Sequence, residues 1–132
     1  MKRYMLDTNV VSDFLRDRAG IDIKMLTLPR ERTFISAIVA AELLYGVSRR
    51  PEATRLNMLV ERFLSEVQIL PWDAEVARVW GIFRTALEKS GRMLEPHDMQ
   101  IAAHAISADM VLVSSDRAFE GIEGLQLENW TV

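Results

Sequence analysis

Short apolar segments alternate with helical segments along almost the whole chain, and this alternation restricts the fold more than any other feature. Strands are predicted at 2–6, 33–36, 68–70, 110–114 and 125–128. The segments between them carry apolar residues at helical spacing, most clearly in the stretch 53–67. Strands that alternate with helices form parallel sheets with helices on both faces. The chain is therefore predicted to have an α/β fold around a central parallel sheet.

The helices of this pattern are bounded by recognisable start and stop residues. They are predicted at 9–15, 22–28, 38–47, 53–67, 73–90 and 96–107. Asp73 is placed to cap the fifth of these helices, and Gly91 follows its end, where glycine is favoured. Pro96 stands in the first turn of the last helix, a position that tolerates proline.

Composition places the chain among ordinary globular proteins and removes several kinds of chemistry. A length of 132 residues predicts a single domain, residues 1–132, large enough to bury a core. No cysteine is present, which excludes disulfides, thiolate metal sites and cysteine nucleophiles. The chain has two histidines, too few for a zinc site rich in histidine. The net charge of −3 argues against a non-specific DNA-binding protein, whose affinity rests on lysine and arginine.

The chain also has no sequence signal that directs it to a membrane. A charged residue, Lys2, comes before any apolar segment of the length found in signal peptides. No apolar run approaches the roughly 18 residues that a membrane-spanning helix needs. A cytoplasmic location is the resulting expectation.

Four acidic residues stand where predicted strands end or predicted helices begin. Asp7 and Asp116 follow two of the strands, Asp98 opens the helix after Pro96, and Glu42 lies in an otherwise apolar helix. In parallel α/β sheets the ligand site lies beyond the carboxyl ends of the strands. We therefore predict that the four carboxylates converge at one edge of the sheet.

Each of these acids also has a simpler explanation. Asp7 and Asp116 are placed to cap the helices that follow them. Asp98 lies in a first helical turn, where the helix dipole favours an acid. Glu42 is the more informative residue, because a carboxylate among Ile38, Val39 and Tyr45 loses hydration unless it is paired or bound to a metal. An exposed helical glutamate is the alternative for Glu42.

Considered together, the four acids predict a metal site. Carboxylates brought close together raise one another's pKa, and a bound divalent cation removes that cost. Oxygen ligands are preferred by Mg²⁺ and Mn²⁺. Asp7, Glu42, Asp98 and Asp116 are therefore predicted as metal ligands and catalytic residues, with a metal-activated water attacking a phosphodiester. No organic cofactor is predicted.

Hydroxyl and amide groups beside these acids are candidates for auxiliary roles, and they belong to Thr8, Asn9, Ser36, Ser114 and Ser115. Thr8 and Ser115, each adjacent to a predicted ligand, are the preferred candidates, whereas Asn9 and Ser36 are expected to cap turns and helices. Structural or surface roles are expected for His97 and His104.

Four segments of the chain, in this order, resemble the PIN-domain nucleases, and more narrowly the VapC-type toxins of toxin–antitoxin pairs. They are Leu6-Asp7-Thr8-Asn9, the stretch 36–46 around Glu42, the stretch 96–105 around Asp98 and the stretch 112–119 around Asp116. The closing segment 125–130 also looks like the end of such toxins. The resemblance spans nearly the whole chain.

This resemblance implies a three-layer α/β/α PIN fold with a central parallel sheet of four to five strands. It further implies a Mg²⁺- or Mn²⁺-dependent endoribonuclease whose acidic motif residues are Asp7, Glu42, Asp98 and Asp116. The implied partners are a structured RNA substrate such as tRNA, a second copy of the chain in a homodimer, and a cognate antitoxin. The C-terminal segment of that antitoxin would lie over the active-site groove.

One segment departs from many relatives, which often carry Thr-Asn-Asn where this chain has Ser114-Ser115-Asp116. Asp116 can serve there as the fourth acid. Two other functions fit the same residues: a non-catalytic module whose acidic pocket binds a basic peptide, and a PIN nuclease that processes RNA or repairs DNA without being a toxin. Cleavage of RNA separates the first from a nuclease, and growth arrest on expression separates the second from a toxin.

Overall fold

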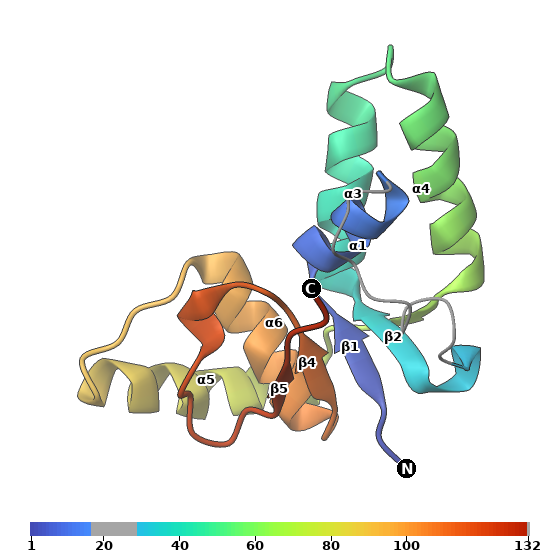
Figure 1. Cartoon of the computed structure of the whole chain (residues 1–132). Coiled ribbons are helices and arrows are strands. Elements are labelled where there is room, and N and C mark those ends of the chain that lie inside the picture. Colours follow the sequence, from blue (N-terminus) through green and yellow to red (C-terminus); the bar gives the residue numbers. More distant parts are fainter. Residues whose placement is uncertain (17–28, 132) are drawn as a thin grey trace.

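Five short strands form one parallel sheet in the computed structural model, which describes residues 1–16 and 29–131 (Figure 1). The strands are β1 (Tyr4–Leu6), β2 (Thr33–Ser36), β3 (Gln68–Leu70), β4 (Val111–Val113) and β5 (Leu127–Glu128). Their spatial order is β3-β2-β1-β4-β5, and all four neighbouring pairs run parallel. The predicted α/β fold with a parallel sheet of four to five strands is confirmed.

The helices lie where the apolar spacing predicts them, with ends that differ by a few residues. They are α1 (Thr8–Leu15), α3 (Ala37–Arg49), α4 (Thr54–Glu66), α5 (Ala74–Lys89) and α6 (Pro96–Ser107). Two short 3₁₀ helices, η1 (Arg30–Arg32) and η2 (Arg117–Phe119), were not predicted. Gly91 has a φ of 76°, so it supplies the left-handed conformation that ends α5. The helix predicted at 22–28 lies outside the described residues.

The helices form two groups that meet where the strands end. Figure 1 shows α5 and α6 packed together on one side, whereas α3 and α4 form a hairpin on the other side with α1 beside it. Among the described residues, no helix is long and apolar enough to span a membrane. The carboxyl ends of β1, β2 and β4 lead directly or through short turns into α1, α3 and η2.

The central strands are buried, and their register aligns the ends that carry polar residues. Met5, Leu6, Leu112 and Val113 are fully buried in the core. Leu6 pairs with Val113, so the residues that follow β1 and β4 emerge side by side. Because Asp7 follows Leu6 directly, its carboxylate is fixed at the same height in the sheet as the segment after β4. The core thus positions the polar edge of the sheet.

Candidate active site

The structure brings the four predicted acids to the same edge of the sheet. Asp7 follows β1, Glu42 lies on α3, Asp98 lies in the first turn of α6, and Asp116 precedes η2. The charges of Asp7, Asp116 and Glu42 all raise the pKa of Asp98, which places the four carboxylates within electrostatic reach of one another. The convergence predicted from strand ends is thereby observed.

Asp7 is the most deeply buried of the four acids and the most firmly held. Its residue surface is 4% exposed. Oδ1 accepts a hydrogen bond of 2.8 Å from the Thr8 amide, and Oδ2 accepts one of 2.8 Å from the hydroxyl of Ser114. Burial raises the pKa of Asp7, the two hydrogen bonds lower it, and the charges of Glu42 and Asp116 raise it further, for a net increase. Asp7 therefore caps α1 and belongs to the acidic cluster.

The serine that contacts the acids is Ser114, whereas the sequence analysis preferred Ser115. Ser114 is buried, and its hydroxyl donates to Asp7 while accepting a hydrogen bond of 3.0 Å from the Asp116 amide. Ser115 is exposed. Ser114 directly follows the buried strand β4 and is buried with it, whereas Ser115 lies beyond the buried segment. Every residue of β4 is buried, so the sequence of this strand has no alternation that would have distinguished the two serines.

Thr8 and Glu42 form a direct link between α1 and α3. The hydroxyl of Thr8 donates a hydrogen bond of 2.9 Å to Oε1 of Glu42. The other predicted auxiliary residue, Thr8, thus contacts a member of the cluster. Glu42 is half-buried, as expected for a carboxylate on the inner side of an apolar helix.

Asp98 differs from Asp7 in having no such support. Among residues 1–16 and 29–131, no hydrogen bond to its carboxylate is formed. Burial is the main reason that its pKa rises to about 6, and the charges of Asp7, Asp116, Glu42 and Glu95 raise it further. Glu95, which precedes α6, is an acid near the site that the sequence analysis did not include.

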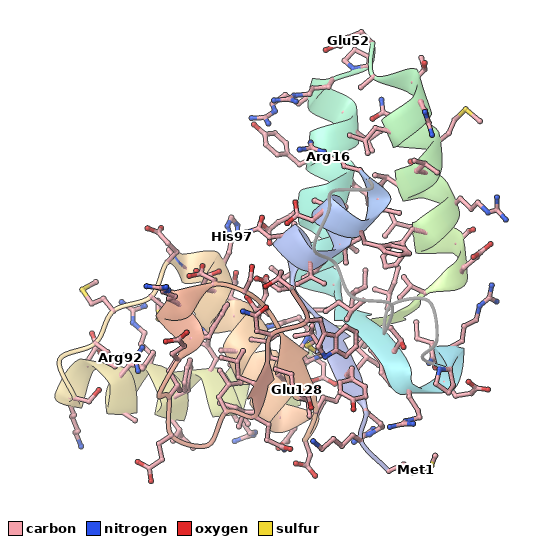
Figure 2. All side chains as sticks on the ribbon, viewed as in Figure 1. Met1, Arg16, Glu52, Arg92, His97 and Glu128 are labelled. Atoms are coloured by element: carbon pink, nitrogen blue, oxygen red, sulfur yellow. The ribbon has the colours of Figure 1, made fainter. Side chains whose placement is uncertain are left out.

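Asp116 lies at the outer side of the cluster and holds a turn. Oδ1 accepts a hydrogen bond of 2.9 Å from the Ala118 amide, so Asp116 caps η2 as well as facing the other acids. Arg92 donates hydrogen bonds of 2.8 Å to the carbonyl groups of Ala118 and Glu120 (Figure 2). These contacts fix the turn that carries Asp116. Asp116 itself is only partly buried.

The donor atoms of this cluster suit a hard divalent cation. All of its ligating groups are carboxylate oxygens, with hydroxyl groups from Thr8 and Ser114 beside them. Burial is the main cause of the raised pKa of Asp7 and of Asp98, and the charges of neighbouring acids add to it, so a cation would relieve the part that comes from repulsion. Within the described ranges, no three Asp, Glu, His or Cys side chains are gathered tightly enough to form a ready-made metal site. The cluster therefore fits a cation in chemistry and charge without being a closed cage.

A small cavity opens beside the cluster, between α1, α3 and α4. Its volume is about 90 Å³, and Thr8 and Glu42 line the end nearest the acids. Arg16 and Arg49 line it as well, and Figure 2 shows Arg16 at the end of α1, next to α3. A cationic surface thus adjoins the acidic one, although the chain as a whole carries a net charge of −3.

The two histidines differ in position. His97 is exposed at the start of α6 (Figure 2), whereas His104 is 3% exposed and lies 2.8 Å from the hydroxyl of Ser36, measured from Nδ1 to Oγ. Structural or surface roles were expected for both histidines, and both positions are consistent with that expectation. The burial of His104 had one signal in the sequence, because His104 stands within the apolar run 101–105.

Comparison with known proteins identifies the family. The PIN domain model matches residues 4–125, which include all four acids. The chain is 31% identical over 132 residues to the tRNA(fMet)-specific endonuclease VapC of Shigella flexneri, a match that covers 99% of this chain and 100% of that protein. It belongs to the VapC-type PIN-domain family.

Further relatives of this VapC-type chain agree in length and fold. Ribonuclease VapC2 of Haemophilus influenzae is 34% identical, with 98% of this chain and 99% of that protein covered. The crystal structure of DNA-bound VapBC from Salmonella typhimurium superposes with a TM-score of 0.89 at 33% identity, over 98% of this chain and 99% of that one. The PIN-like fold and the resemblance drawn from the four sequence motifs are both confirmed.

Proposed function

We propose that this VapC-type chain is a divalent-metal-dependent endoribonuclease that acts as the toxin of a toxin–antitoxin pair. The observation that carries the proposal is the convergence of four carboxylates from four different elements at the carboxyl edge of the sheet. Such a cluster is costly to the fold unless a cation occupies it. Hydrolysis of nucleic acid is the chemistry that best accounts for a cluster of four carboxylates at this position.

Asp7, Glu42, Asp98 and Asp116 would hold the cation, Mg²⁺ or Mn²⁺. When bound, the cation would lower the pKa of a water molecule and stabilise negative charge on the phosphate oxygens. Asp7 is oriented for this role by Ser114 and by the Thr8 amide, which leave its carboxylate little freedom to turn. Thr8 orients Glu42 in the same way through its hydroxyl group.

Asp98 is the residue of the cluster best suited to exchanging a proton. Burial and the charges of Asp7, Asp116, Glu42 and Glu95 disfavour its charged form and raise its pKa to about 6 in the metal-free chain. A cation held by the cluster would favour the charged form and lower that pKa again. Asp98 can therefore take up a proton when the cluster is free and give it up when a cation arrives.

RNA is the proposed substrate, and structured RNA such as tRNA is the proposed class. The support comes from the relatives, which include a tRNA(fMet)-specific endonuclease and a ribonuclease. The arginine-lined cavity beside the acids offers a surface on which a phosphate backbone can rest. Ser115, exposed next to Asp116, is proposed as an auxiliary contact to substrate.

The proposed protein partner is an antitoxin whose C-terminal segment covers the acidic groove. Support comes from the solved VapBC relatives, a family of toxin–antitoxin systems. We further propose that the chain forms a homodimer and acts in the cytoplasm, where its RNA substrates are found. Light scattering on the purified chain tests the dimer directly.

The decisive experiment for the enzyme is RNA cleavage by the purified chain with Mg²⁺ or Mn²⁺. Cleavage is expected with either metal, and it should stop with a chelator and in the Asp7→Asn variant. Glu75→Gln is the matched control, because Glu75 is exposed on α5 and its substitution also removes one negative charge. Full cleavage in excess chelator or by Asp7→Asn would rule out this enzyme. Metal binding without any cleavage would favour the acidic binding module instead.

The toxin role needs a separate test in cells. Expression of the chain is expected to arrest growth, and co-expression of a neighbouring small gene should relieve the arrest. Mapping new RNA ends after inducing wild type and Asp7→Asn side by side would identify the substrate. Cleavage without growth arrest would favour an RNA-processing nuclease that is not a toxin.

A further inference from the structure

A buried hydrogen bond joins the two helices that carry Glu42 and Asp98. Ser36 ends β2 and caps α3, and it is completely buried. His104 lies on α6 and is almost completely buried, with Nδ1 2.8 Å from Oγ of Ser36. The two residues are far apart in sequence, so this bond connects elements that the chain itself does not join.

The hydroxyl of Ser36 serves both helices at once. It accepts a hydrogen bond of 3.1 Å from the Ile38 amide, which caps α3. Its single proton can then be donated to Nδ1 of His104, provided that the imidazole is neutral. Burial lowers the pKa of His104 and so favours this neutral form. One oxygen atom thus fixes the start of α3 and contacts the last turn of α6.

Each residue of this hydrogen bond is separated from the acid on its own helix by the same number of residues. Glu42 follows Ser36 by six residues on α3, and Asp98 precedes His104 by six residues on α6. The two helices also contact each other directly. A shift of α6 along α3 would therefore change the distance between the two carboxylates and would break this hydrogen bond.

We propose that Ser36 and His104 are positioning residues that fix the separation of Glu42 and Asp98 and thereby set the affinity of the acidic cluster for a divalent cation. This inference rests on the proposed metal-dependent function. Neither side chain needs to touch the cation or the substrate. A buried polar pair is directional, so it selects one relative placement of two helices that apolar packing alone would leave free to slide.

The other side of the cluster contains a comparable bond. The hydroxyl of Ser114 joins Asp7 to the Asp116 amide, directly at two of the acids. Ser36 and Ser114 both lie at carboxyl ends of strands, and both are buried. Ser114 acts on the acids themselves, whereas Ser36 and His104 act through the helices that bear Glu42 and Asp98.

The test is the affinity of the full chain for Mn²⁺, measured by titration calorimetry, in four variants. Ser36→Ala and His104→Leu remove the hydrogen bond and are expected to weaken Mn²⁺ binding by about 10-fold to 100-fold, as loss of a group that orients metal ligands does. Ser36→Thr keeps the hydroxyl, and His104→Asn places an amide near Nδ1, so both are expected to retain most of the affinity.

Loss of general stability must be separated from loss of positioning. Ile122→Ala is the control, because Ile122 is buried between η2 and β5, outside α3, α6 and the cavity beside Glu42, and its truncation also lowers the melting temperature. Ile122→Ala is expected to bind Mn²⁺ like wild type. RNA cleavage by Ser36→Ala should recover at high Mn²⁺ concentration, and its melting curve in chelator should show that the chain is folded before the metal is added.

Wild-type affinity in both Ser36→Ala and His104→Leu would overturn the inference and leave the proposed function intact. Equal weakening in Ile122→Ala would overturn it as well, since the effect would then follow stability alone. A wild-type chain that binds no Mn²⁺ and cleaves no RNA would refute the proposed function, and the inference with it.

Discussion

The two sides of the acidic cluster are built differently. On one side, Asp7 and Asp116 follow buried strands and share the hydroxyl of Ser114. On the other side, Glu42 and Asp98 stand on two helices, and within the described part of the chain only Glu42 of the two receives a side-chain hydrogen bond, from Thr8. The first side is fixed by the sheet, whereas the second depends on how the helices pack.

This difference explains the electrostatics of the cluster. Hydrogen bonds partly offset the rise in the pKa of Asp7, whereas Asp98 has only burial and neighbouring acids acting on it, and all of these raise its pKa. An anchored carboxylate is suited to holding a cation in a defined place. The pKa of a carboxylate that accepts no hydrogen bond depends more strongly on the charges around it. The cluster thus combines one fixed member with one responsive member.

Replacing Asp7 by Asn tests the fixed side and should have the largest effect. Cleavage of RNA is expected to fall by a factor on the order of 100 to 1000, the scale seen when one essential charge-stabilising group is lost. The metal-free fold should not be strongly destabilised, because the substitution removes a buried charge that its neighbours repel. Cleavage rates and thermal melts in chelator check the two statements. A large loss of melting temperature in chelator would contradict the second.

The matched pair Ser114→Ala and Ser115→Ala tests whether the buried hydroxyl fixes Asp7 and Asp116. Ser114→Ala is expected to reduce cleavage by about 10-fold to 100-fold, because it removes a group that orients a metal ligand. It should also destabilise the fold by about 1–3 kcal/mol, since the Asp116 amide loses its partner. Ser115→Ala should leave the melting temperature unchanged. Equal destabilisation by both substitutions would contradict the assignment.

Replacing Asp116 by Asn should have a smaller effect than replacing Asp7. We expect cleavage to fall about tenfold, the equivalent of about 1.4 kcal/mol. Asp116 is partly exposed, so solvent weakens its electrostatic contribution, and asparagine can still cap η2. Cleavage rates of Asp116→Asn and Asp7→Asn, measured side by side, check the ranking. An Asp116→Asn variant as inactive as Asp7→Asn would show that the outer acid is equally essential.

The pH dependence of stability tests the role of Asp98, and we expect this effect to be the smallest. Because the pKa of Asp98 is about 6 in the folded chain and 3.8 is its ordinary value, the folded state binds more protons between these values. The metal-free fold should therefore lose stability as pH rises from about 4 to about 6. In chelator, Asp98→Asn should become more stable relative to wild type over that range, whereas Glu75→Gln should not. A difference that stays constant with pH would contradict this account.

Much of the fold could be predicted because the apolar pattern is strongly periodic. The sequence predicts all five strands, and the rule for parallel strand ends predicts that Asp7 and Asp116 lie together. The short helix η2 was not predicted, because a 3₁₀ turn of three residues has too few positions to show a helical spacing of apolar residues. Its capping residue, Asp116, was nonetheless recognised as a cap candidate.

The helical side of the site was harder to predict in detail. The contact between Thr8 and Glu42 was not specified by the sequence, because it depends on how α1 packs against α3. The bond between Ser36 and His104 depends likewise on the relative placement of α3 and α6. No periodic rule in the sequence links residues on two separate helices.

The central claim is that both sides of the cluster hold the same divalent cation. Calorimetric titration of Mn²⁺ into wild type, Asp7→Asn, Asp98→Asn and the double variant tests this claim most directly. If the cation is shared, each single substitution should weaken binding at least tenfold, and the effects should not simply add, because the two residues serve one ion. Unchanged Mn²⁺ affinity in either single variant would contradict the claim, because that acid would then lie outside the site.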